Sequence, residues 1–515
     1  MLDAALDGLL ALLTPQSLLF MAIGVAFGIV IGFLPGVGGV VAMALLLPFI
    51  FGRDPAAAMA LLLGAHVATI YNDAITGILF GVPGSAKGVA LCFDGYPMTQ
   101  RGGAARALGI TAMSSLLGGL VGVAFLIAIL PVVRALMLAL GPPEYFIMGL
   151  WGLSVIALFS KGSVFKGLAA GGLGLLLATV GEDPVSSTQR FTFGSLYLAD
   201  GVDFAVAAIG LFAVSQMISL YVKGGTIVTR RPSSDQRSTV WHGVRDVFRH
   251  KRVLVQSSAL GVFIGALPGV GAAVGGIAAY GQVARSSRDS SQFGKGDVRG
   301  IVAPAATLGA NEGGGLLPTL GFGIPGGESG AILLSALLVI GVAPGPELLT
   351  SGLDLVFSMI WVIVLANLLT TGAGLFTAPI FARMTTVPGS RLVPLILAVC
   401  FTGVYAINQR VEDVVLCALL GVVGYFLKKY RYPLAGVAIG LVLGPILERY
   451  LHVSVSLYGS LFWLERPVSL LLLIFVIGTV VASPARAAWA TWRRRRTGGG
   501  DGSDVDAESV RGAPR

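Results

Sequence analysis

Long apolar stretches follow one another along almost the whole chain, and they limit its fold more than any other feature. A helix that spans a bilayer needs about 20 apolar residues, and only helices and closed barrels satisfy their backbone polar groups inside lipid. After the connecting segments are subtracted, the chain has room for roughly ten to twelve spanning helices. The sequence therefore predicts an all-α polytopic membrane protein. The stretches cover residues 17–33, 37–51, 56–80, 107–131, 146–160, 164–181, 203–222, 253–267, 270–284, 301–323, 329–343, 354–373, 391–406, 412–427, 433–447 and 467–483.

Composition excludes a water-soluble globule. Charged residues make up 12% of the 515 residues and hydrophobic residues 55%, whereas a soluble domain carries roughly 25% charged residues. The net charge of +9 comes from basic residues in connecting segments and the C-terminal tail. This distribution is typical of topology signals in a lipid bilayer, and we expect no nucleic-acid partner. The three cysteines lack the spacing of a disulfide framework or zinc site, so we interpret them as packing residues: Cys92, Cys400 and Cys417.

A basic segment divides the chain into two halves. Lys223 to Arg252 holds eight Lys and Arg residues against two acids, so the positive-inside rule places it in the cytoplasm. The last residues are rich in Gly, Asp and Ser and have no apolar face, which is typical of disorder. The predicted parts are a first transmembrane half, a basic cytoplasmic loop, a second transmembrane half and a disordered cytoplasmic tail, at residues 15–222, 223–252, 253–485 and 493–515.

An internal repeat relates the two halves. Ile31–Gly39 recurs as Ile264–Ala272, with seven of nine positions identical at an offset of 233 residues. A second Pro-Gly break follows each copy, within Gly81–Ser85 and within Gly323–Gly327. We predict two related halves, and we expect them to be inverted because the acidic N-terminus favours an outside start and the basic loop an inside start.

The Pro-Gly breaks predict a transport site. Proline removes a backbone donor and glycine tolerates positive φ, so each break ends a helix and frees backbone groups at membrane depth. Such groups need protein or a water-filled cavity to receive them. Discontinuous helices of secondary transporters use their N-termini to bind anions and their unwound carbonyls to bind Na⁺. We therefore expect re-entrant elements that contribute to one central site.

Polar residues surround the breaks and complete the predicted site. Asp73 and Glu312 are ionisable residues inside apolar segments, where a binding role competes with a structural ion pair or a helix end that reaches water. Lys87 is suited to pair with an anionic substrate or to cap the adjacent turn. Asp94, in contrast, is interpreted as a turn residue at the membrane surface. The candidate substrate and ion ligands are Pro35, Gly36, Gly38, Asn72, Asp73, Thr76, Pro83, Gly84, Ser85, Lys87, Pro268, Gly269, Gly271, Asn311, Glu312, Pro325, Gly326 and Ser329.

From about residue 15 to 485, the sequence resembles the large permease subunit of the tripartite tricarboxylate transporter family. The resemblance rests on Gly32–Gly39, Asp94–Met98, Gly265–Gly271 and Gly323–Gly326, with Leu443–Pro445 near the end. It implies a multi-pass secondary transporter of the bacterial inner (cytoplasmic) membrane that works with a small four-helix membrane subunit and a periplasmic solute-binding protein. Such a complex would import organic di- or tricarboxylates by symport with Na⁺ or H⁺, without ATP, a cofactor or enzymatic activity.

This chain departs from the family pattern in the residues that precede the break within Gly81–Ser85. The family usually has Tyr-Gly-Gly-Ser where this chain has Tyr71–Ala74, and here the sequence gains Asp73 and Glu312. These differences speak against citrate itself and fit H⁺ in place of Na⁺, because buried carboxylates take up protons. The alternative function is a channel or exporter of small organic anions acting without a binding protein. An embedded enzyme would rest on the two carboxylates alone, with no nucleophile or metal cluster beside them.

Overall fold

The computed structural model describes residues 1–32, 38–81, 85–159, 164–183, 187–223, 239–268, 271–381, 389–459 and 466–478. The first part of the chain forms α1 (Leu2–Leu12), α2 (Pro15–Gly32), α3 (Gly39–Leu46), η1 (Leu47–Ile50), α4 (Pro55–Phe80), η2 (Ala86–Gly88), α5 (Val89–Gln100), α6 (Ala104–Ala139), α7 (Pro142–Phe159), α8 (Val164–Ala178), β1 (Gly181–Glu182), β2 (Gln189–Arg190), α9 (Leu196–Ala199), α10 (Phe204–Ala208), the π-helical η3 (Ile209–Val214) and α11 (Ser215–Lys223). The remainder forms α12 (Val240–Arg249), α13 (Lys251–Ala266), α14 (Gly271–Ser286), α15 (Val298–Phe322), α16 (Glu328–Val339), α17 (Pro346–Ser351), α18 (Leu353–Phe381), α19 (Gly389–Asn408), α20 (Val411–Lys429), α21 (Leu434–Tyr458) and a last helix at Pro467–Gly478.

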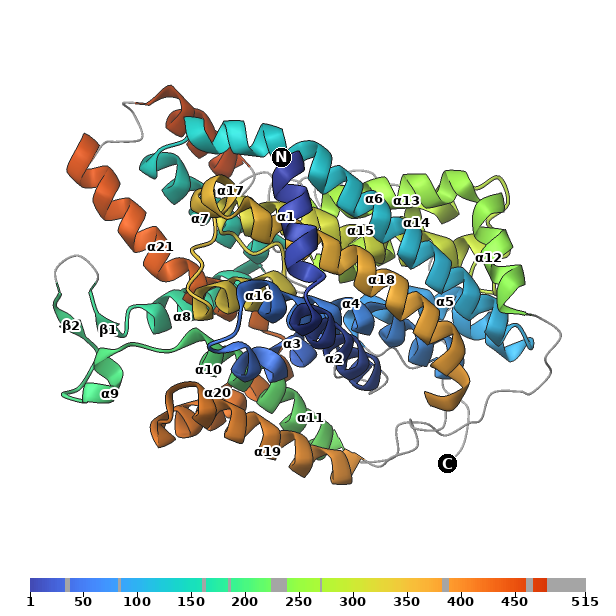
Figure 1. The fold of residues 1–515 in the computed structure, drawn as a ribbon, viewed down its shortest axis with the longest axis horizontal. Helices are drawn as coiled ribbons and strands as arrows, with labels where there is room; N and C mark the ends of the chain where they lie inside the picture. Colours follow the sequence, from blue (N-terminus) through green and yellow to red (C-terminus); the bar gives the residue numbers. More distant parts are fainter. Residues whose placement is uncertain are drawn as a thin grey trace, which may run out of the picture.

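This architecture confirms the all-α polytopic class (Figure 1). Among the described residues, six helices are long and apolar enough to cross a membrane, by length and composition. Five shorter apolar helices accompany them, α3 with η1 among them. Helices this short fit discontinuous or re-entrant elements better than complete crossings. The number of crossings and the relation between the halves stay predictions.

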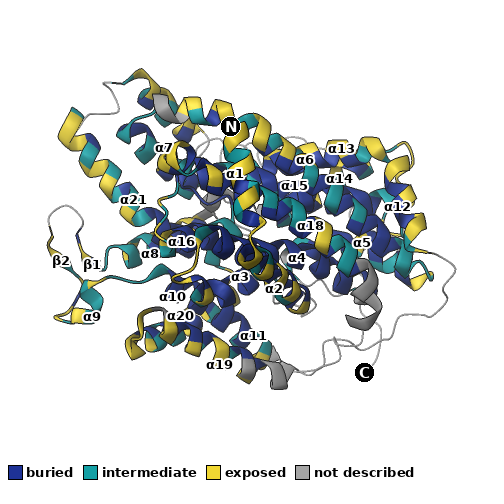
Figure 2. Ribbon diagram, in the orientation of Figure 1, coloured by how far each residue is buried: buried dark blue, intermediate teal, exposed yellow. Residues whose placement is uncertain are grey.

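The two central helices, α4 and α15, are built alike. Each begins at an aspartate whose carboxylate accepts hydrogen bonds from first-turn amides, Asp54 for α4 and Asp297 for α15. Each ends at a glycine with left-handed φ, +69° at Gly81 and +66° at Gly323. Both glycines directly precede the second break of their half. Both helices are dark blue along most of their length in Figure 2, because neighbouring helices bury them on almost every side.

Small residues let these helices approach their neighbours closely. A Cβ added to Gly28 of α2 would lie 2.2 Å from the Ala65 carbonyl oxygen of α4, and one added to Gly309 of α15 would lie 2.1 Å from the Ser115 carbonyl oxygen of α6. Lipid tails are as apolar as leucine, so helices in a membrane associate through such close packing and not through the hydrophobic effect. These contacts fix the positions of α4 and α15.

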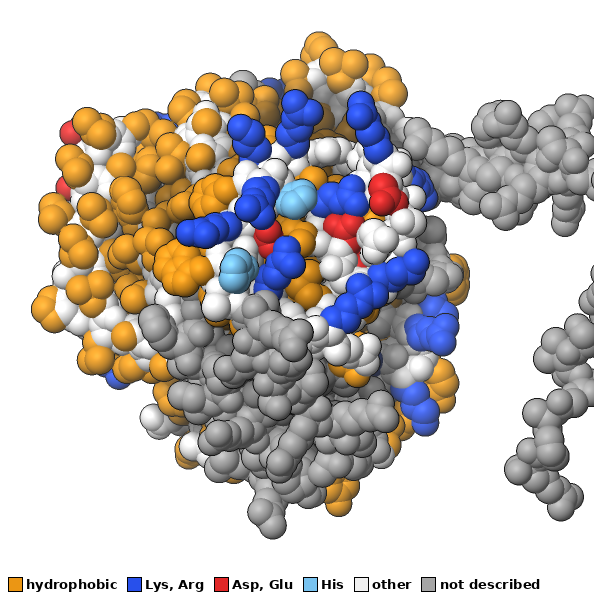
Figure 3. Space-filling model, turned by 90° about the vertical axis from the view of Figure 1, so that its right-hand side faces the viewer, with side chains coloured by type: hydrophobic (Ala, Val, Ile, Leu, Met, Phe, Trp, Pro, Cys, Tyr) orange, Lys and Arg blue, Asp and Glu red, His pale blue; other side chains and the backbone are white. Residues whose placement is uncertain are grey.

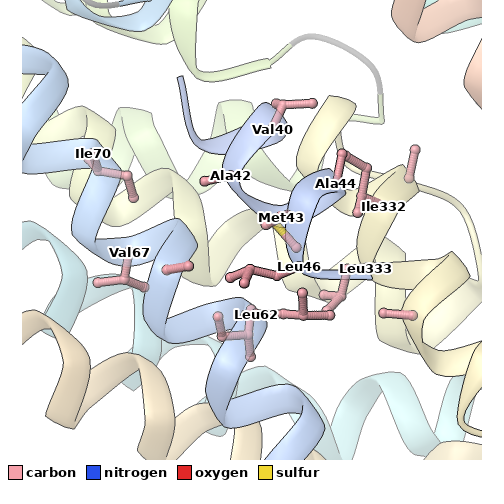
Figure 4. Close-up of a cluster of buried hydrophobic side chains, with 14 of the residues drawn as sticks. Val40, Ala42, Met43, Ala44, Leu46, Leu62, Val67, Ile70, Ile332 and Leu333 are labelled. Carbon is pink, nitrogen blue, oxygen red and sulfur yellow. The ribbon is translucent and has the colours of Figure 1, made fainter. Parts of the chain in front are cut away.

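Helix α3 of the first half packs against α16 of the second half. Figure 4 shows α3 between α4 and α16: Met43 and Leu46 of α3 lie among Leu62 of α4 and Ile332 and Leu333 of α16. Helix α3 follows the first break of the first half, and α16 follows the second break of the second half. The segments that follow these two breaks thus share one apolar cluster.

Basic residues gather at one end of the molecule. Figure 3 looks at the end where α12 lies and shows Lys and Arg side chains collected on that face. There Arg106 Nε of α6 donates a hydrogen bond of 2.6 Å to Asp246 Oδ2 of α12. Residues 239–252 of the predicted basic loop are thus helical and packed on α6, whereas residues 224–238 and the predicted tail at 493–515 lie outside the described residues. The cytoplasmic position of this end stays a prediction.

The interpretation of Asp94 as a surface turn residue is wrong. Asp94 lies inside α5 and is fully buried. Its carboxylate accepts hydrogen bonds from the Tyr280 hydroxyl at 2.9 Å and from the backbone amides of Gly296 and Asp297 at 2.7 and 2.9 Å. All three donors are far away in the sequence, so no local pattern could indicate them. The carboxylate ties the loop before α15 to α5 and α14.

Replacing Asp94 with asparagine is expected to loosen this loop. The N–H groups of the asparagine amide would face the hydroxyl and backbone amides that now donate to Asp94, and only one uncharged acceptor oxygen would remain. A hydrogen bond to a charged group contributes about 1.5–3 kcal/mol to stability. We expect a lower Tm in detergent and faster trypsin cleavage at the exposed Arg288 and Lys295. Glu412→Gln, which changes an exposed acid in the first turn of α20, is the control, and equal cleavage of both variants would contradict the role of Asp94.

Candidate functional site

The first break places the start of α3 directly on one face of α4. A Cβ added to Gly39 would lie 2.2 Å from Thr69 Oγ1 and 2.8 Å from His66 Nδ1. One added to Gly38 would lie 3.5 Å from Asp73 Oδ2. His66, Thr69 and Asp73 share a face of α4 because they are three and four residues apart. Only glycine permits this approach, which brings the N-terminal amides of α3 to a polar face inside the protein.

A hydrogen bond joins α4 to α15 at this face, and an ion pair joins η2 to the same carboxylate of α15. His66 Nε2 lies 2.8 Å from Glu312 Oε2, and Lys87 Nζ, from η2, lies 3.7 Å from Glu312 Oε1. Glu312 is 12% exposed, Lys87 20% and His66 only 2%. Residues 246 positions apart in the sequence thus meet between the two predicted halves. The carboxylate has a nitrogen donor or cation at each oxygen, and the lysine faces the more open side.

Asp73 is the second acid of the cluster. Its side chain is 3% exposed, it accepts a hydrogen bond from the Ser85 hydroxyl, and it interacts electrostatically with Lys87. Its Oδ1 atom is buried without a hydrogen-bond partner. Ser85 also caps η2 by accepting a hydrogen bond of 3.2 Å from the Lys87 backbone amide. Lys87 is therefore a single ammonium between two carboxylates, one on α4 and one on α15.

The side chains of three predicted polar ligands donate to backbone carbonyls, two within α4 and one on α13. Asn72 donates to the Ala68 carbonyl at 2.6 Å, and Thr76 donates to the Asp73 carbonyl at 3.1 Å. Asn311 donates to the Gly261 carbonyl of α13 at 3.4 Å. The structure brings Gly38, Asp73, Ser85, Lys87 and Glu312 together. Asn72 and Thr76 bond within α4, and Asn311 connects α15 to α13.

The two breaks of the second half lie in apolar surroundings. Pro268 is buried and lines a cavity of about 230 Å³ whose walls are almost entirely apolar, with Pro318 and Ile324 among them. The Gly326 amide donates to Thr319 Oγ1 at 3.1 Å, which folds the chain back onto α15 beside the buried Pro325. The two remaining predicted ligands lie in first turns, Gly271 of α14 and Ser329 of α16.

Some predicted ligands lie outside the described residues, namely Pro35, Gly36, Pro83, Gly84 and Gly269.

Sequence reasoning missed His66, although the signal was present. It is the only histidine within the apolar segment 56–80 and precedes Asp73 by seven residues, which is two helical turns. That spacing places both on one face. Its partner Glu312 could not be inferred, because the contact depends on how α4 and α15 cross.

A second polar cluster is already neutralised. Ligand atoms of Asp183, Glu448 and His452 lie within 4.8 Å of one another, a spacing suited to a metal ion. Arg190 occupies this place: its guanidinium donates to Glu448 at 2.6 and 3.0 Å and lies 3.4 Å from Asp183. The Glu448 carboxylate holds the pKa of Arg190 above its usual value by accepting these hydrogen bonds. The cluster fits a structural ion pair.

Comparisons with known proteins agree with the transport interpretation. Residues 18–439 match the model of the tripartite tricarboxylate transporter TctA family. An uncharacterized 52.8 kDa protein in the TAR-I ttuC' 3' region of Agrobacterium vitis is 30% identical over 471 residues, which cover 91% of this chain and 93% of that protein. An uncharacterized protein in the TAR-II ttuC' 3' region of the same organism is 31% identical over 192 residues, 37% of this chain and 79% of that protein. No solved structure matches the chain.

Proposed function

The chain belongs to the tripartite tricarboxylate transporter TctA family, and on this premise we propose that it is the large permease subunit of a binding-protein-dependent secondary transporter. The proposed complex imports organic di- or tricarboxylates by ion symport across the bacterial inner membrane. Its other members are a small four-helix membrane subunit and a periplasmic solute-binding protein. No catalytic step is part of the proposal.

The observation that carries the substrate class is the position of Lys87. Its partly exposed ammonium lies between acids of the two halves, and one of these acids, Asp73, lies next to Gly38, where α3 begins. Amides at a helix N-terminus and an ammonium are both complementary to a carboxylate. A substrate carboxylate would thus provide an anionic partner for the N–H groups at the start of α3, and this supports a carboxylate site between α3 and Lys87.

The alternative, a channel or exporter acting without a binding protein, differs in its energetics. A channel needs no carboxylate cluster that must be neutralised in each cycle, and it carries solute only down its gradient. The buried, oppositely charged groups between the halves favour a site that closes around its substrate. Uphill accumulation that requires the binding protein separates the two functions.

We expect cells that make this chain with its two partner subunits to accumulate at least one labelled acid from a panel of acetate, succinate and citrate. Uptake is measured with and without a Na⁺ gradient and with and without a pH gradient. Accumulation above the external concentration that disappears without the binding protein supports the proposal. Equilibration without accumulation would indicate a channel, and faster efflux than in empty cells an exporter.

A further inference from the structure

We propose that transport by this chain is coupled to protons through an exchange of partners at Lys87. The substrate carboxylate takes the Lys87 ammonium away from Glu312, and the Glu312–His66 pair then binds one proton that crosses with the substrate. The inference rests on the proposed function and names its coupling ion.

The two contacts of Glu312 differ in a way that makes Lys87 the partner that leaves. The 2.8 Å separation from His66 is a hydrogen bond between two groups on long packed helices. The 3.7 Å separation from Lys87 is too long for a hydrogen bond, so it is an ion pair only. Lysine carries its charge on a flexible stem, and Lys87 is the most exposed group of the three. An incoming carboxylate therefore competes for Lys87 while His66 stays in place.

The exchange leaves a charge that the site must neutralise. Once Lys87 pairs with the substrate, Glu312 is an anion that faces a neutral imidazole inside the protein, and an unpaired buried charge is strongly disfavoured. His66 has the means to accept a proton: its Nδ1 atom is buried and has no hydrogen-bond partner. A proton added there produces an imidazolium that remains paired with Glu312 through Nε2–H. The proton balances the charge of the one substrate carboxylate that pairs with Lys87, and it does not balance the further carboxylates of a di- or tricarboxylate.

The surroundings favour a proton over Na⁺ at this pair. Sodium requires several oxygen ligands, whereas the atoms next to the Glu312 oxygens are nitrogens. Helices α2 and α3 carry no ionisable residue, and Asp73 is the nearest further acid, on the far side of Lys87. On α4 itself, Tyr71 is buried against Gly374 of α18, and its hydroxyl has no hydrogen-bond partner. Further ionisable groups on the packed helices are paired elsewhere or lie toward helix ends: Asp94 with Tyr280, Arg106 with Asp246, Arg299 with Asp297, Arg134 toward the end of α6, Lys251 and Arg252 at the start of α13, Arg285 in the last turn of α14 and Asp354 in the first turn of α18.

The test uses the complete complex in proteoliposomes with labelled acetate, succinate and citrate as probes. We measure counterflow, which needs substrate exchange but no coupling, and accumulation driven by a pH gradient or by a Na⁺ gradient. A pH-sensitive dye reports proton entry. For the wild-type chain we expect accumulation to follow the pH gradient. About one proton should enter with each substrate molecule whose carboxylate pairs with Lys87.

Two variants remove the proton site in different ways. In Glu312→Gln and His66→Gln we expect counterflow to persist with an altered KM, while accumulation driven by the pH gradient falls at least tenfold and substrate-linked proton entry disappears. Glutamine at position 66 keeps an N–H donor for Glu312 but cannot be protonated. Glu412→Gln, which changes an exposed acid in the first turn of α20, is the matched control and should keep full coupling.

The outcomes separate this inference from the proposed function. Counterflow together with accumulation that follows Na⁺ overturns the proton coupling alone. Substrate-linked proton entry retained in both variants overturns the Glu312–His66 pair as the proton site. Absence of both counterflow and accumulation in the wild-type complex overturns the proposed function and the inference with it. Should one variant fail to assemble, the other still tests the Glu312–His66 pair, and the proton stoichiometry of the wild type tests the coupling.

Discussion

Replacing Lys87 with methionine is expected to lower carboxylate uptake at least about 100-fold. Methionine keeps most of the length of the side chain but removes the ammonium that lies between Glu312 and Asp73. Breaking a buried ion pair by removing one partner costs about 3–5 kcal/mol, and about 1.4 kcal/mol corresponds to a factor of ten. Because Lys87 is partly exposed, we take the lower end of that range. The remaining acids also repel the substrate.

The measurement is initial uptake together with substrate binding by the purified complex. Lys87→Arg keeps the positive charge and should retain part of the activity, and the exposed Lys295→Met is the control for loss of a charge elsewhere. The decisive variant is Lys87→Met combined with Glu312→Gln. A purely structural ion pair predicts that this double variant regains substrate binding and counterflow relative to Lys87→Met, because the Lys87–Glu312 pair is then removed as a whole. A substrate-binding lysine predicts that substrate binding and counterflow both stay lost while the double variant inserts normally.

The class of fold and the positions of the helix ends could be predicted because they depend on local chemistry. Apolar length predicts membrane helices. A glycine before each Pro-Gly pair predicts a stop, and α4 and α15 do end at Gly81 and Gly323 with left-handed φ. Asp73 and Glu312 were identifiable as candidates because a charge inside an apolar segment is costly and needs a reason.

The arrangement of the site could not be predicted, because neighbours in a helix sequence point in different directions. Asn72 adjoins Asp73 in the sequence, yet it lies against Gly32 of α2, where a Cβ on that glycine would meet the Asn72 Cβ at 2.7 Å. Asn311 likewise adjoins Glu312 but lies against Gly265 of α13. Successive residues are rotated by about 100° around a helix. Which of them faces the cluster depends on the packing of α2 and α13, which leaves no local mark.

Changing Gly309 to alanine is expected to have the largest effect on assembly, and it connects packing to the site. The added Cβ would lie 2.1 Å from the Ser115 carbonyl oxygen and 2.8 Å from the Gly119 amide nitrogen, both backbone atoms of α6. Side-chain rotation cannot relieve such a contact, so α15 must move away from α6. Overpacking of this kind typically costs 1–3 kcal/mol. Glu312 lies one helical turn further along α15, so the same movement displaces its carboxylate from His66.

We expect Gly309→Ala to reduce the yield of folded protein in detergent and to lower the Tm by several degrees, with uptake per folded molecule reduced at least tenfold. The control is Gly172→Ala in α8, where a Cβ meets no atom within 4 Å. Alanine is favoured over glycine in a helix by about 1 kcal/mol, so this control should be neutral or slightly stabilising. The two substitutions add the same methyl group to a helical glycine, and only the distance to the neighbouring backbone differs. Equal stability and uptake in both variants would mean that close contact between α6 and α15 does not hold Glu312 in position.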